Sequence, residues 1–434
     1  MSSMVTIEKV IAGGKGLARS DDGMVVMIPG VLPGERVEIG DGRLRSGYWE
    51  AESLSVDNSH PKRVVPLCSY YGECGGCDLQ HADYDLQLEI KRDIVIESLI
   101  RAGVECDEGV VRSVLPSPVT FGYRHRIRCQ VSADGMVGFF QRGSKTVVGV
   151  AGCLTATKPI NDLLEKLGND QVRTALSSWC TELELLHSPG DDTVALVASV
   201  KSVRRDIKKR AQRVVELLGV KTFFLRKGRH IEALFSTASD YSLSQIFRLF
   251  SGEREVVLSW GVGCFSQVNG AQNEQLVELT TSLLGDIKGT RMLDLYCGAG
   301  NFSIPFGSFG ARGMGVEQSS LSIEWAQRNA VHGLIKDWKF IAADVELVLK
   351  GLVKKEEVFD ILICDPPRRG LGKAVQGVGA LKCRKIVYIS CDPATLARDI
   401  KVLQSMGARL VSLTPVDMFP QTHHIESVAL LEKN

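Results

Sequence analysis

The sequence predicts an α/β protein in which a small β-barrel and a mixed central region precede a doubly wound parallel sheet. Its 434 residues are too many for a single core, so two or three domains are expected. Short, alternating strand-like segments separated by glycine turns fill residues 1–59, which is typical of a small barrel. From about Gly261 onward, strand-like and helix-like segments alternate, as they do in a parallel sheet with crossover helices.

The predicted elements divide the chain into residues 1–59, 60–260 and 261–434. The strands expected in the first part are VTIEKVI, GMVVMIPG, RVEIG and YWEAESLSV. The central part should begin with an amphipathic helix over about 84–102, and KSVRRDIKKRAQRVVELLG should form another helix. In the last part, strands are expected at RMLDLYCGAGN, GARGMGVEQ, WKFIAADV, FDILICDPP, KIVYISC and SVALLEK.

Composition limits the classes of protein. A hydrophobic content of 44% with 24% charged residues is that of an ordinary soluble protein. We see no apolar run long enough for a membrane span and no apolar signal-peptide core, so a cytoplasmic protein without membrane contact is expected. The net charge of +1 gives no support for nucleic-acid binding through bulk charge. Binding would need a local patch. At residues 123–128 RNA contact is slightly favoured over a charged strand face, whereas residues 201–213 fit a solvated helix face at least as well as contact with phosphates.

A glycine loop after a buried strand predicts a cofactor site. In DLYCGAGN, Asp294 ends the strand, and Gly298 and Gly300 let the backbone approach a ligand. Glu317 ends the next strand and can bond ribose hydroxyls. The third glycine of a dinucleotide fingerprint is replaced by Ser303, and no phosphate-binding lysine is present. An adenosine without a pyrophosphate fits better, and S-adenosylmethionine is the candidate. Two further carboxylates at strand ends on this edge of the sheet support it: Asp344 and Asp365.

A cysteine and a carboxylate supply candidate catalytic groups. Cys391 ends the apolar strand KIVYISC, immediately before Asp-Pro, and thiolates are the strongest common side-chain nucleophiles near neutral pH. Glu426 lies near the C-terminus in VDMFPQTHHIE and can act as a base. Alternatively, Cys391 is a buried strand-end thiol and Glu426 a surface charge. His423 and His424 could be ligands or bases, but we expect one of them to order the loop.

A second group of cysteines predicts a metal centre. Cys68, Cys74 and Cys77 have the spacing C-x5-C-x2-C, and Cys153 is a plausible fourth ligand. Four thiolates suit either zinc or an iron–sulfur cluster, and the spacing alone does not decide between them. The isolated cysteines are expected to pack in cores rather than act as ligands: Cys106, Cys129, Cys180, Cys264 and Cys383. Cys297 and Cys364 border the cofactor site, where packing at strand ends explains them.

Taken together, these segments resemble the RNA uracil-5-methyltransferases, most closely those that modify 23S ribosomal RNA. The resemblance covers nearly the whole chain. It rests on long, ordered segments: GGKGLAR, VLPGERV, the C-x5-C-G-G-C-D-L-Q-H stretch, FSQVNGAQNEQL, DPPRRG, YISCDPAT and DMFPQTHHIE. The family usually has Asn after the nucleophile, where this chain has Asp392.

The resemblance implies a fold and a set of roles. Residues 1–59 would form a TRAM domain, an OB-like RNA-binding β-barrel. Residues 60–260 would form an α+β iron–sulfur domain, with a 4Fe–4S cluster on Cys68, Cys74, Cys77 and Cys153, and 261–434 a Rossmann-like class I SAM-dependent methyltransferase domain. Cys391 would be the nucleophile that attacks uracil carbon-6, and Glu426 the base. Cofactor contacts would fall on Gln267, Tyr296, Asn301, Glu317, Asp344 and Asp365.

The implied partner is 23S rRNA, bound by a monomer. A tRNA substrate is the nearest alternative, but the tRNA enzymes of the family generally lack both the TRAM domain and the cysteine cluster. A radical methylthiotransferase would need C-x3-C-x2-C, and here the first spacing is five. A non-catalytic RNA-binding assembly factor would not require Cys391 and Glu426, and both are present.

Overall fold

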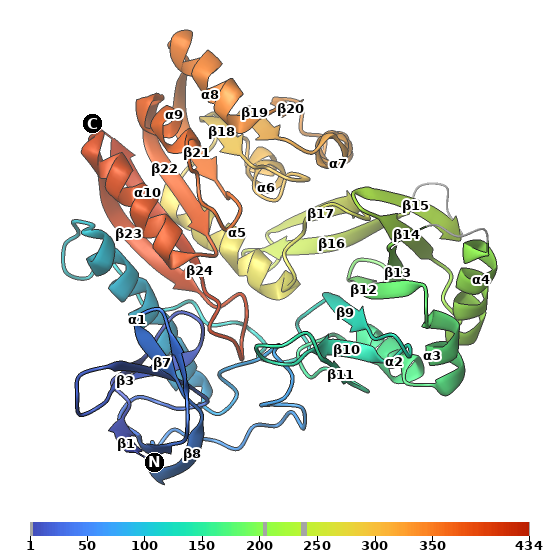
Figure 1. Cartoon of the computed structure of the whole chain (residues 1–434). Coiled ribbons are helices and arrows are strands. Elements are labelled where there is room, and N and C mark those ends of the chain that lie inside the picture. Colours follow the sequence, from blue (N-terminus) through green and yellow to red (C-terminus); the bar gives the residue numbers. More distant parts are fainter. Residues whose placement is uncertain (1–2, 203–205, 236–240, 434) are drawn as a thin grey trace.

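The computed structural model describes residues 3–202, 206–235 and 241–433 (Figure 1). Positions 203–205 of the helix predicted over residues 201–219 lie outside the described residues, and the helix observed in the described part runs over Ile207–Leu218. Figure 1 shows three parts: the N-terminal strands at the lower left, the central sheet at the right and the C-terminal sheet at the upper left. Helix α1 lies beside the C-terminal sheet. Among the described residues, none of the helices has both the length and the apolar character needed to cross a membrane.

The N-terminal part is all β. Within residues 3–58, all described, the sheet orders are β1-β5-β8 and β2-β3-β4-β7-β6. Alternate residues of β3, β4 and β5 are buried, and they enclose a small core that includes Ala18, Ile28 and Val37. This period of two is the predicted strand signal. The strands are β1 (Ser3–Thr6), β2 (Lys9–Val10), β3 (Lys15–Arg19), β4 (Val25–Pro29), β5 (Arg36–Ile39), β6 (Arg43–Arg45), β7 (Tyr48–Glu50) and β8 (Ser53–Asn58).

The central part contains a mixed sheet with helices packed beside it. Across its described residues the sheet order is β11-β10-β9-β12-β13-β14-β15, and only the β13–β14 pair is parallel. The elements are β9 (Arg126–Val131), β10 (Val137–Phe140), β11 (Val147–Gly149), α2 (Lys158–Leu167), α3 (Asp170–Leu176), β12 (Cys180–Ser188), β13 (Thr193–Val200), α4 (Ile207–Leu218), β14 (Phe223–Lys227) and β15 (His230–Phe235).

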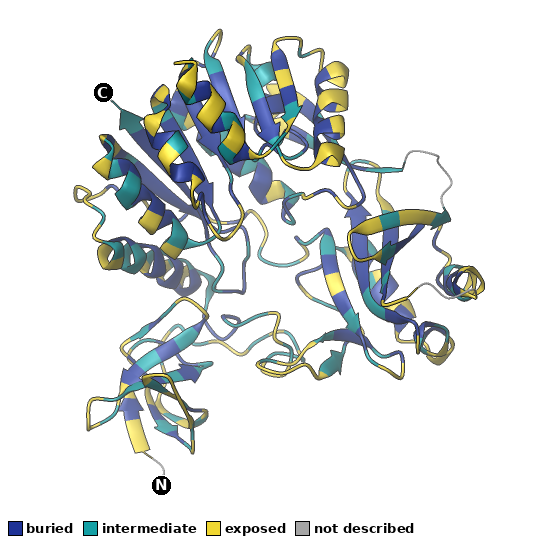
Figure 2. Cartoon of the chain, turned by 45° about the horizontal axis from the view of Figure 1, so that its top comes forward, coloured by how far each residue is buried: buried dark blue, intermediate teal, exposed yellow. Residues whose placement is uncertain are grey.

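The C-terminal part is the predicted doubly wound α/β sheet. Within residues 270–433, all described, the strand order is β20-β19-β18-β21-β22-β24-β23. The elements are α5 (Gly270–Leu284), β18 (Arg291–Leu295), α6 (Ser303–Ser308), β19 (Arg312–Glu317), α7 (Ser320–His332), β20 (Trp338–Ala342), α8 (Val345–Lys354), β21 (Val358–Cys364), α9 (Ala374–Ala380), β22 (Lys382–Ser390), α10 (Pro393–Ser405), β23 (Ala408–Val416) and β24 (Glu426–Lys433). Figure 2 shows buried strands between helices whose outer faces are exposed.

The end of this sheet differs from the prediction of a purely parallel sheet. The strand β23 was not singled out in the sequence, and β24 inserts between β22 and β23, antiparallel to both. A strand that returns after a short loop can only run antiparallel, because a parallel neighbour needs a long crossover connection. The N-terminal residue of β24, Glu426, is thereby placed at the edge of the sheet where the parallel strands end.

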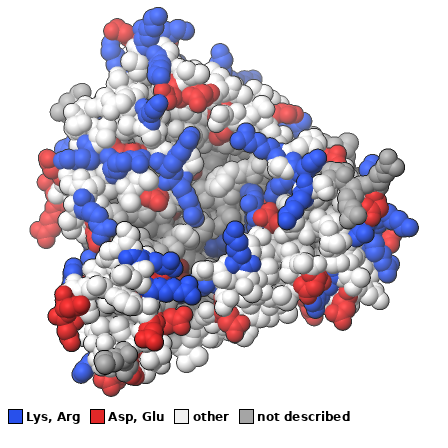
Figure 3. Space-filling view, in the orientation of Figure 1, with Lys and Arg blue, Asp and Glu red and all other residues white. Residues whose placement is uncertain are grey.

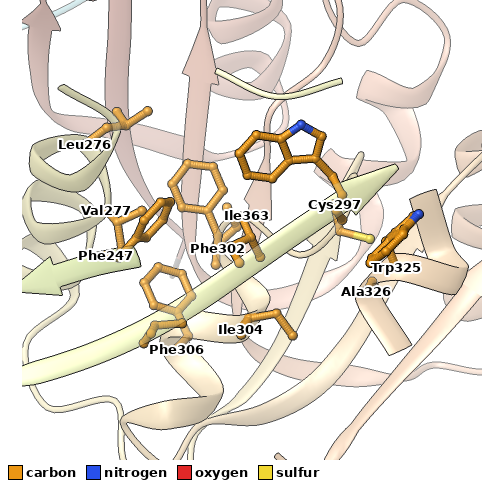
Figure 4. Packing of buried hydrophobic residues seen from close by; sticks show 14 of the residues in the cluster. Phe247, Leu276, Val277, Cys297, Phe302, Ile304, Phe306, Trp325, Ala326 and Ile363 are labelled. Atoms are coloured by element: carbon orange, nitrogen blue, oxygen red, sulfur yellow. The ribbon is translucent and has the colours of Figure 1, made fainter. Parts of the chain in front are cut away.

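Two segments from the predicted central domain pack against the C-terminal sheet. Helix α1 (Tyr84–Ala102), with the bounds expected from the sequence, lies against α10 and β23, and the following segment bridges to β23 at Val111 and Leu115. The hairpin of β16 (Ser242–Leu249) and β17 (Arg254–Gly261) covers the other side. Figure 4 shows Phe247 of this hairpin beside Val277 of α5. The domain boundaries at 59 and 260 stay a prediction.

Candidate active site

A cavity of about 900 Å³ opens at the edge where the parallel strands of the C-terminal sheet end. It is lined by all of the predicted cofactor and catalytic residues except Asn301, namely Gln267, Tyr296, Glu317, Asp344, Asp365, Cys391 and Glu426. The carboxyl ends of parallel strands meet at one edge of a sheet, which is where ligands of doubly wound folds bind. The strand ends predicted from the sequence are therefore neighbours in space.

Strand pairing brings Cys391 and Glu426 together. Cys391 follows β22, and Asp392 caps the next helix by accepting a hydrogen bond from the Thr395 amide at 2.8 Å. The last residue of β22, Ser390, pairs with Ser427 of the antiparallel β24. Continuing this register by one residue places Cys391 opposite Glu426. Two groups that are distant in sequence thus face the same cavity from adjacent strands.

The glycine loop after β18 is held by buried hydrogen bonds. The Asp294 carboxylate accepts bonds from both the backbone amide and the hydroxyl of Ser303, which occupies the position of the missing third glycine. Burial raises the pKa of Asp294 to about 7. Tyr296 adopts a φ of 63°, unusual for a residue with a side chain, and Gly300 one of 97°. This sharp turn aims the loop at the cavity.

Two further carboxylates in the cavity wall, Glu317 and Asp344, accept hydrogen bonds from nearby backbone amides. Glu317 ends β19 and accepts a hydrogen bond from the Ser319 amide at 2.8 Å. Asp344 lies just beyond β20 and caps α8 by accepting from the Leu347 amide at 3.1 Å. Capping alone accounts for an aspartate at this position. Each carboxylate still borders the cavity and can accept hydrogen bonds from a ligand.

Asn301 lies beside the large cavity and not in its wall. It lines a smaller cavity of about 40 Å³ together with Gln267, Tyr296 and Asp365. Its side-chain amide exchanges two hydrogen bonds with the amide of Asn273 on α5, at 2.8 and 3.1 Å. The structure therefore ties Asn301 to α5, and any contact with a ligand would be made from this adjoining space.

Cys391 and Glu426 lie in an environment that favours the neutral forms of both side chains. Burial and the nearby carboxyls of Glu426 and Asp365 raise the pKa of the Cys391 thiol to about 12, although Arg368 acts in the opposite direction. Glu426 is 2% exposed, and burial followed by Asp365 raises its pKa well above the ordinary value. Its Oε1 atom is buried without a hydrogen-bond partner among the described residues. An unpartnered carboxyl oxygen in a cavity wall is suited to receive a proton or a hydrogen bond from a ligand.

Basic and aromatic side chains at the rim were not predicted as site residues. Arg368, Arg369 and Lys373 line the large cavity, and Phe265 is 66% exposed between it and a second cavity. Figure 3 shows Lys and Arg side chains around a central hollow of this face. The arginines of DPPRRG were visible in the sequence but not distinguished from an ordinary charged loop, and nothing in the pattern marked Phe265 as exposed.

The second cavity, of about 480 Å³, contains the predicted cluster ligands. It is lined by all four cysteines, Cys68, Cys74, Cys77 and Cys153, and by arginines of β9 and the residues just before it. It meets the large cavity at residues 265–268. Gly75 passes so close to the chain at Phe140 that a Cβ would lie 3.0 Å from the Phe140 carbonyl oxygen. Any larger residue would crowd this backbone, so the close packing of the cysteine-rich loop, residues 68–79, favours glycine here.

Two kinds of centre were considered for these thiols, a zinc ion and an iron–sulfur cluster. Among the described residues, no three His, Cys, Asp or Glu side chains are arranged to hold one metal ion. Zinc needs its thiolates at about 2.3 Å from a single point. A 4Fe–4S cluster binds one thiolate at each corner and so needs ligands spread around a larger volume. The four thiols line one cavity, and both the zinc and the iron–sulfur assignment stay predictions.

The remaining cysteines and histidines are placed by packing and hydrogen bonds. Cys297 and Cys364 are buried at strand ends, as expected, whereas the prediction that all isolated cysteines lie in cores is wrong for Cys106, which is exposed on the loop after α1. His423 pairs with Asp78, which confirms that one histidine orders the loop before Glu426. His424 stacks near it, and burial lowers the pKa of His424 to about 4.

Comparison with known proteins adds three findings. The family model described as tRNA (Uracil-5-)-methyltransferase matches residues 83–434. Proteins named 23S rRNA (uracil(1939)-C(5))-methyltransferase RlmD are similar over nearly the whole chain. The one from Pseudomonas putida is 32% identical over 435 residues, 98% of this chain and 92% of the relative. The one from Shewanella amazonensis is 33% identical over 427 residues, 96% of this chain and 93% of the relative.

A solved structure shares the fold. It is the crystal structure of the Pyrococcus abyssi tRNA (uracil-54, C5)-methyltransferase in complex with S-adenosyl-L-homocysteine, which matches with a TM-score of 0.73 and 24% identity over 99% of this chain and 100% of that chain. The fold therefore recurs, over nearly the whole chain, in an experimental structure.

Proposed function

Because the chain belongs to the tRNA (uracil-5-)-methyltransferase family, we propose that this enzyme methylates carbon-5 of a uridine in 23S rRNA. The methyl donor is S-adenosylmethionine. The choice of 23S rRNA is supported by the names of the relatives that match nearly full length. The observation that carries the proposal is the single cavity bordered by Cys391, Glu426 and the strand-end carboxylates.

Carbon-5 of uracil is a weak nucleophile and needs covalent activation. The Cys391 thiolate attacks carbon-6, and the electrons of the 5,6 double bond pass to the carbonyl oxygen as an enolate. Carbon-5 then takes the methyl group, which the sulfonium of the bound donor supplies. Glu426 removes the proton from carbon-5, the double bond re-forms, and the thiolate leaves. The target base has to leave its stack to reach the cavity.

The electrostatics of the site affect both proposed roles. Because burial raises the pKa of Glu426, its carboxylate is a stronger base than an exposed one. The raised pKa of Cys391 opposes thiolate formation in the empty site. Arg368 favours the thiolate, and so would the positive charge that the bound donor brings into the cavity. Attack should therefore follow donor binding.

For the cofactor, we propose that Glu317 accepts hydrogen bonds from the ribose hydroxyls. Asp344 and Asp365 would lie near the adenine, and Gln267, Tyr296 and Asn301 would contact the rest of the donor. Support comes from the cavity walls, which contain all of these residues except Asn301, and from the small adjoining cavity that Asn301 borders.

For the other parts, we propose a TRAM domain in residues 1–59 and a 4Fe–4S cluster in the central region. The cluster would be held by Cys68, Cys74, Cys77 and Cys153 and would leave no iron coordination site open, so its role would be structural or in positioning RNA. The arginines beside this cavity and those at the rim of the active site would contact phosphates. The enzyme would work as a monomer in the cytoplasm.

The experiment compares two variants on a denaturing gel with labelled 23S rRNA fragments. Cys391→Ala should abolish both methyl transfer and the covalent adduct. Glu426→Gln should accumulate a methylated enzyme–RNA adduct, because attack and transfer proceed but the carbon-5 proton stays. The matched controls are Cys106→Ala, an exposed thiol, and Glu432→Gln, at the other end of β24. An adduct with Cys391→Ala, or normal turnover with Glu426→Gln, would refute the roles.

The RNA substrate is tested separately. Ribosomal RNA and tRNA from a deletion strain should be digested and their nucleosides measured by mass spectrometry. Loss of 5-methyluridine from 23S rRNA alone supports the proposal. Loss from tRNA alone would replace it with the tRNA alternative, which the description of the family model favours.

A further inference from the structure

The loop that leads into Glu426 is held by side chains from a distant part of the sequence. We call residues 417–425 the base loop. The Asp78 carboxylate accepts a hydrogen bond from the His423 backbone amide at 2.7 Å, and its second oxygen lies 2.5 Å from His423 Nδ1. The backbone amides of Asp78 and Leu79 both donate to the Gln421 carbonyl, at 3.2 and 3.1 Å. The cysteine-rich loop is thus hydrogen-bonded directly to the base loop.

Helix α1 adds a second set of contacts to the same loop. The side chain of Gln87 donates to Gln421 Oε1 at 3.1 Å and accepts from the Gln421 backbone amide at 3.0 Å. Lys91 donates to Asp417 at 2.5 Å and to the Phe419 carbonyl at 3.0 Å. Gln421 itself has a φ of 72°, which costs free energy in a residue with a side chain and persists only where the surroundings enforce it.

Asp78 also touches the N-terminal part of the chain. Gly14, at the turn before β3, lies so close that a Cβ would be 2.6 Å from Asp78 Cγ. Asp78 is the neighbour of the predicted cluster ligand Cys77. The N-terminal strands, the cysteine-rich loop and the base loop therefore meet at this one carboxylate. The partner of Asp78, His423, is separated from Glu426 in the sequence only by His424 and Ile425.

We propose that Asp78 is a positioning residue for Glu426, which couples the cysteine-rich loop and the N-terminal domain to proton removal from carbon-5. The proposal rests on the proposed function. Asp78 does not line the active-site cavity, so it acts through His423 and the base loop. Loss of the hydrogen bonds between Asp78 and His423 should make Glu426 more mobile. Cys391 should stay in place, because it is held by β22 and the capped start of α10. The step that needs the base should slow, while attack and methyl transfer continue.

Two neighbouring glycines offer a matched pair of variants. Gly13 and Gly14 both have positive φ angles, 100° and 71°, so alanine strains the backbone at either position. A Cβ at Gly13 meets nothing within 4 Å, whereas one at Gly14 runs into Asp78. Gly14→Ala and Asp78→Ala should accumulate the methylated adduct and lower kcat by about tenfold or more. Gly13→Ala should behave as the unmodified protein does. Asp78→Asn, which keeps an acceptor for the His423 amide, should restore part of kcat.

Hydrogen exchange provides a readout that does not depend on activity. Backbone amides of residues 417–425 should exchange faster in Asp78→Ala and Gly14→Ala, and those of β22 should not change. The proposal would be overturned if Asp78→Ala and Gly14→Ala both had the same turnover and the same exchange rates as Gly13→Ala. So would the loss of adduct formation together with turnover, since that indicates general damage to the site. If Glu426→Gln forms no adduct while the base loop loosens as expected, the proposed catalytic role has failed and the grip of Asp78 on the loop stands.

Discussion

The buried ion pair between α1 and the base loop gives a prediction about stability. Lys91 Nζ lies 2.5 Å from Asp417 Oδ1, and both side chains are 0% exposed. Lys91→Met keeps the length of the side chain and removes its charge. The Asp417 carboxylate would then stay buried with the Tyr84 hydroxyl, at 2.8 Å, as its remaining side-chain partner. Breaking one side of a buried pair costs about 3–5 kcal/mol of unfolding free energy.

The cost should be recovered when the second charge is removed. In Lys91→Met/Asp417→Asn the amide can still accept from Tyr84, and replacing both charges of a buried pair is often close to neutral. The control is Lys9→Met. Lys9 also pairs with α1, at 2.8 Å from Glu97, but it is 43% exposed, and such a pair is worth less than about 1 kcal/mol. Urea-induced unfolding followed by fluorescence measures all three variants. If Lys91→Met unfolds at the same urea concentration as Lys9→Met, the interpretation of this pair is refuted.

Three further outcomes are expected. Glu317→Ala should weaken S-adenosylmethionine binding by about 1.5–3 kcal/mol in calorimetry, which is the scale for charge-assisted hydrogen bonds. The control Glu324→Ala, on the outside of α7, should not weaken binding. Equal affinities of the two variants would remove Glu317 from the site. Because the pKa of Cys391 is raised to about 12, the rate of its alkylation in the free enzyme should rise about 100-fold from pH 8 to pH 10. The alkylation rate of an ordinary thiol rises only a few-fold over the same range. A rate that reaches a plateau below pH 10 would contradict the raised pKa. Anaerobically purified protein should contain about four irons per chain, and Cys153→Ser should lower both iron content and soluble yield; stoichiometric zinc without iron or sulfide would contradict the cluster.

The C-terminal fold and the composition of the site follow from local sequence patterns. The strand ends at Asp294, Glu317 and Asp365 were recognisable because short apolar runs stop at a polar residue, and parallel strands place such residues on one edge. The position of Cys391 between a strand and the Pro393 helix start is equally local. These features depend on residues a few positions apart, so a single sequence is sufficient to predict them.

Contacts between distant segments were not predictable in the same way. The face of α1 that docks contains the polar residues Gln87 and Lys91 as well as leucines and isoleucines, so its apolar pattern does not show where it packs. The partners of those polar groups lie in the base loop, more than three hundred positions further along the chain. Antiparallel insertion of β24, which places Glu426 beside Cys391, likewise depends on strand pairing and not on the pattern of its own residues.

The electrostatic environment of Cys391, the proposed nucleophile, could also be described only from the structure. The motif around Cys391 indicates a reactive thiol, and an isolated motif carries no information about burial. In the fold, burial raises the pKa of the thiol, and the carboxyls of Glu426 and Asp365, which face the same cavity, raise it further. In the proposed mechanism, the positive charge of the bound donor therefore has to favour the thiolate, a requirement that the motif alone does not reveal.

The most direct test of covalent catalysis uses a 23S rRNA fragment in which 5-fluorouridine replaces uridine. Fluorine at carbon-5 cannot be removed as a proton, so the enzyme should stop as a methylated covalent complex. Proteolysis and mass spectrometry of that complex should find one modified peptide, with the nucleotide on Cys391 and an added methyl group, and Cys391→Ala should give none. Modification of another cysteine, with Cys364 and Cys297 the nearest candidates, or methylation without any covalent complex, would contradict the mechanism.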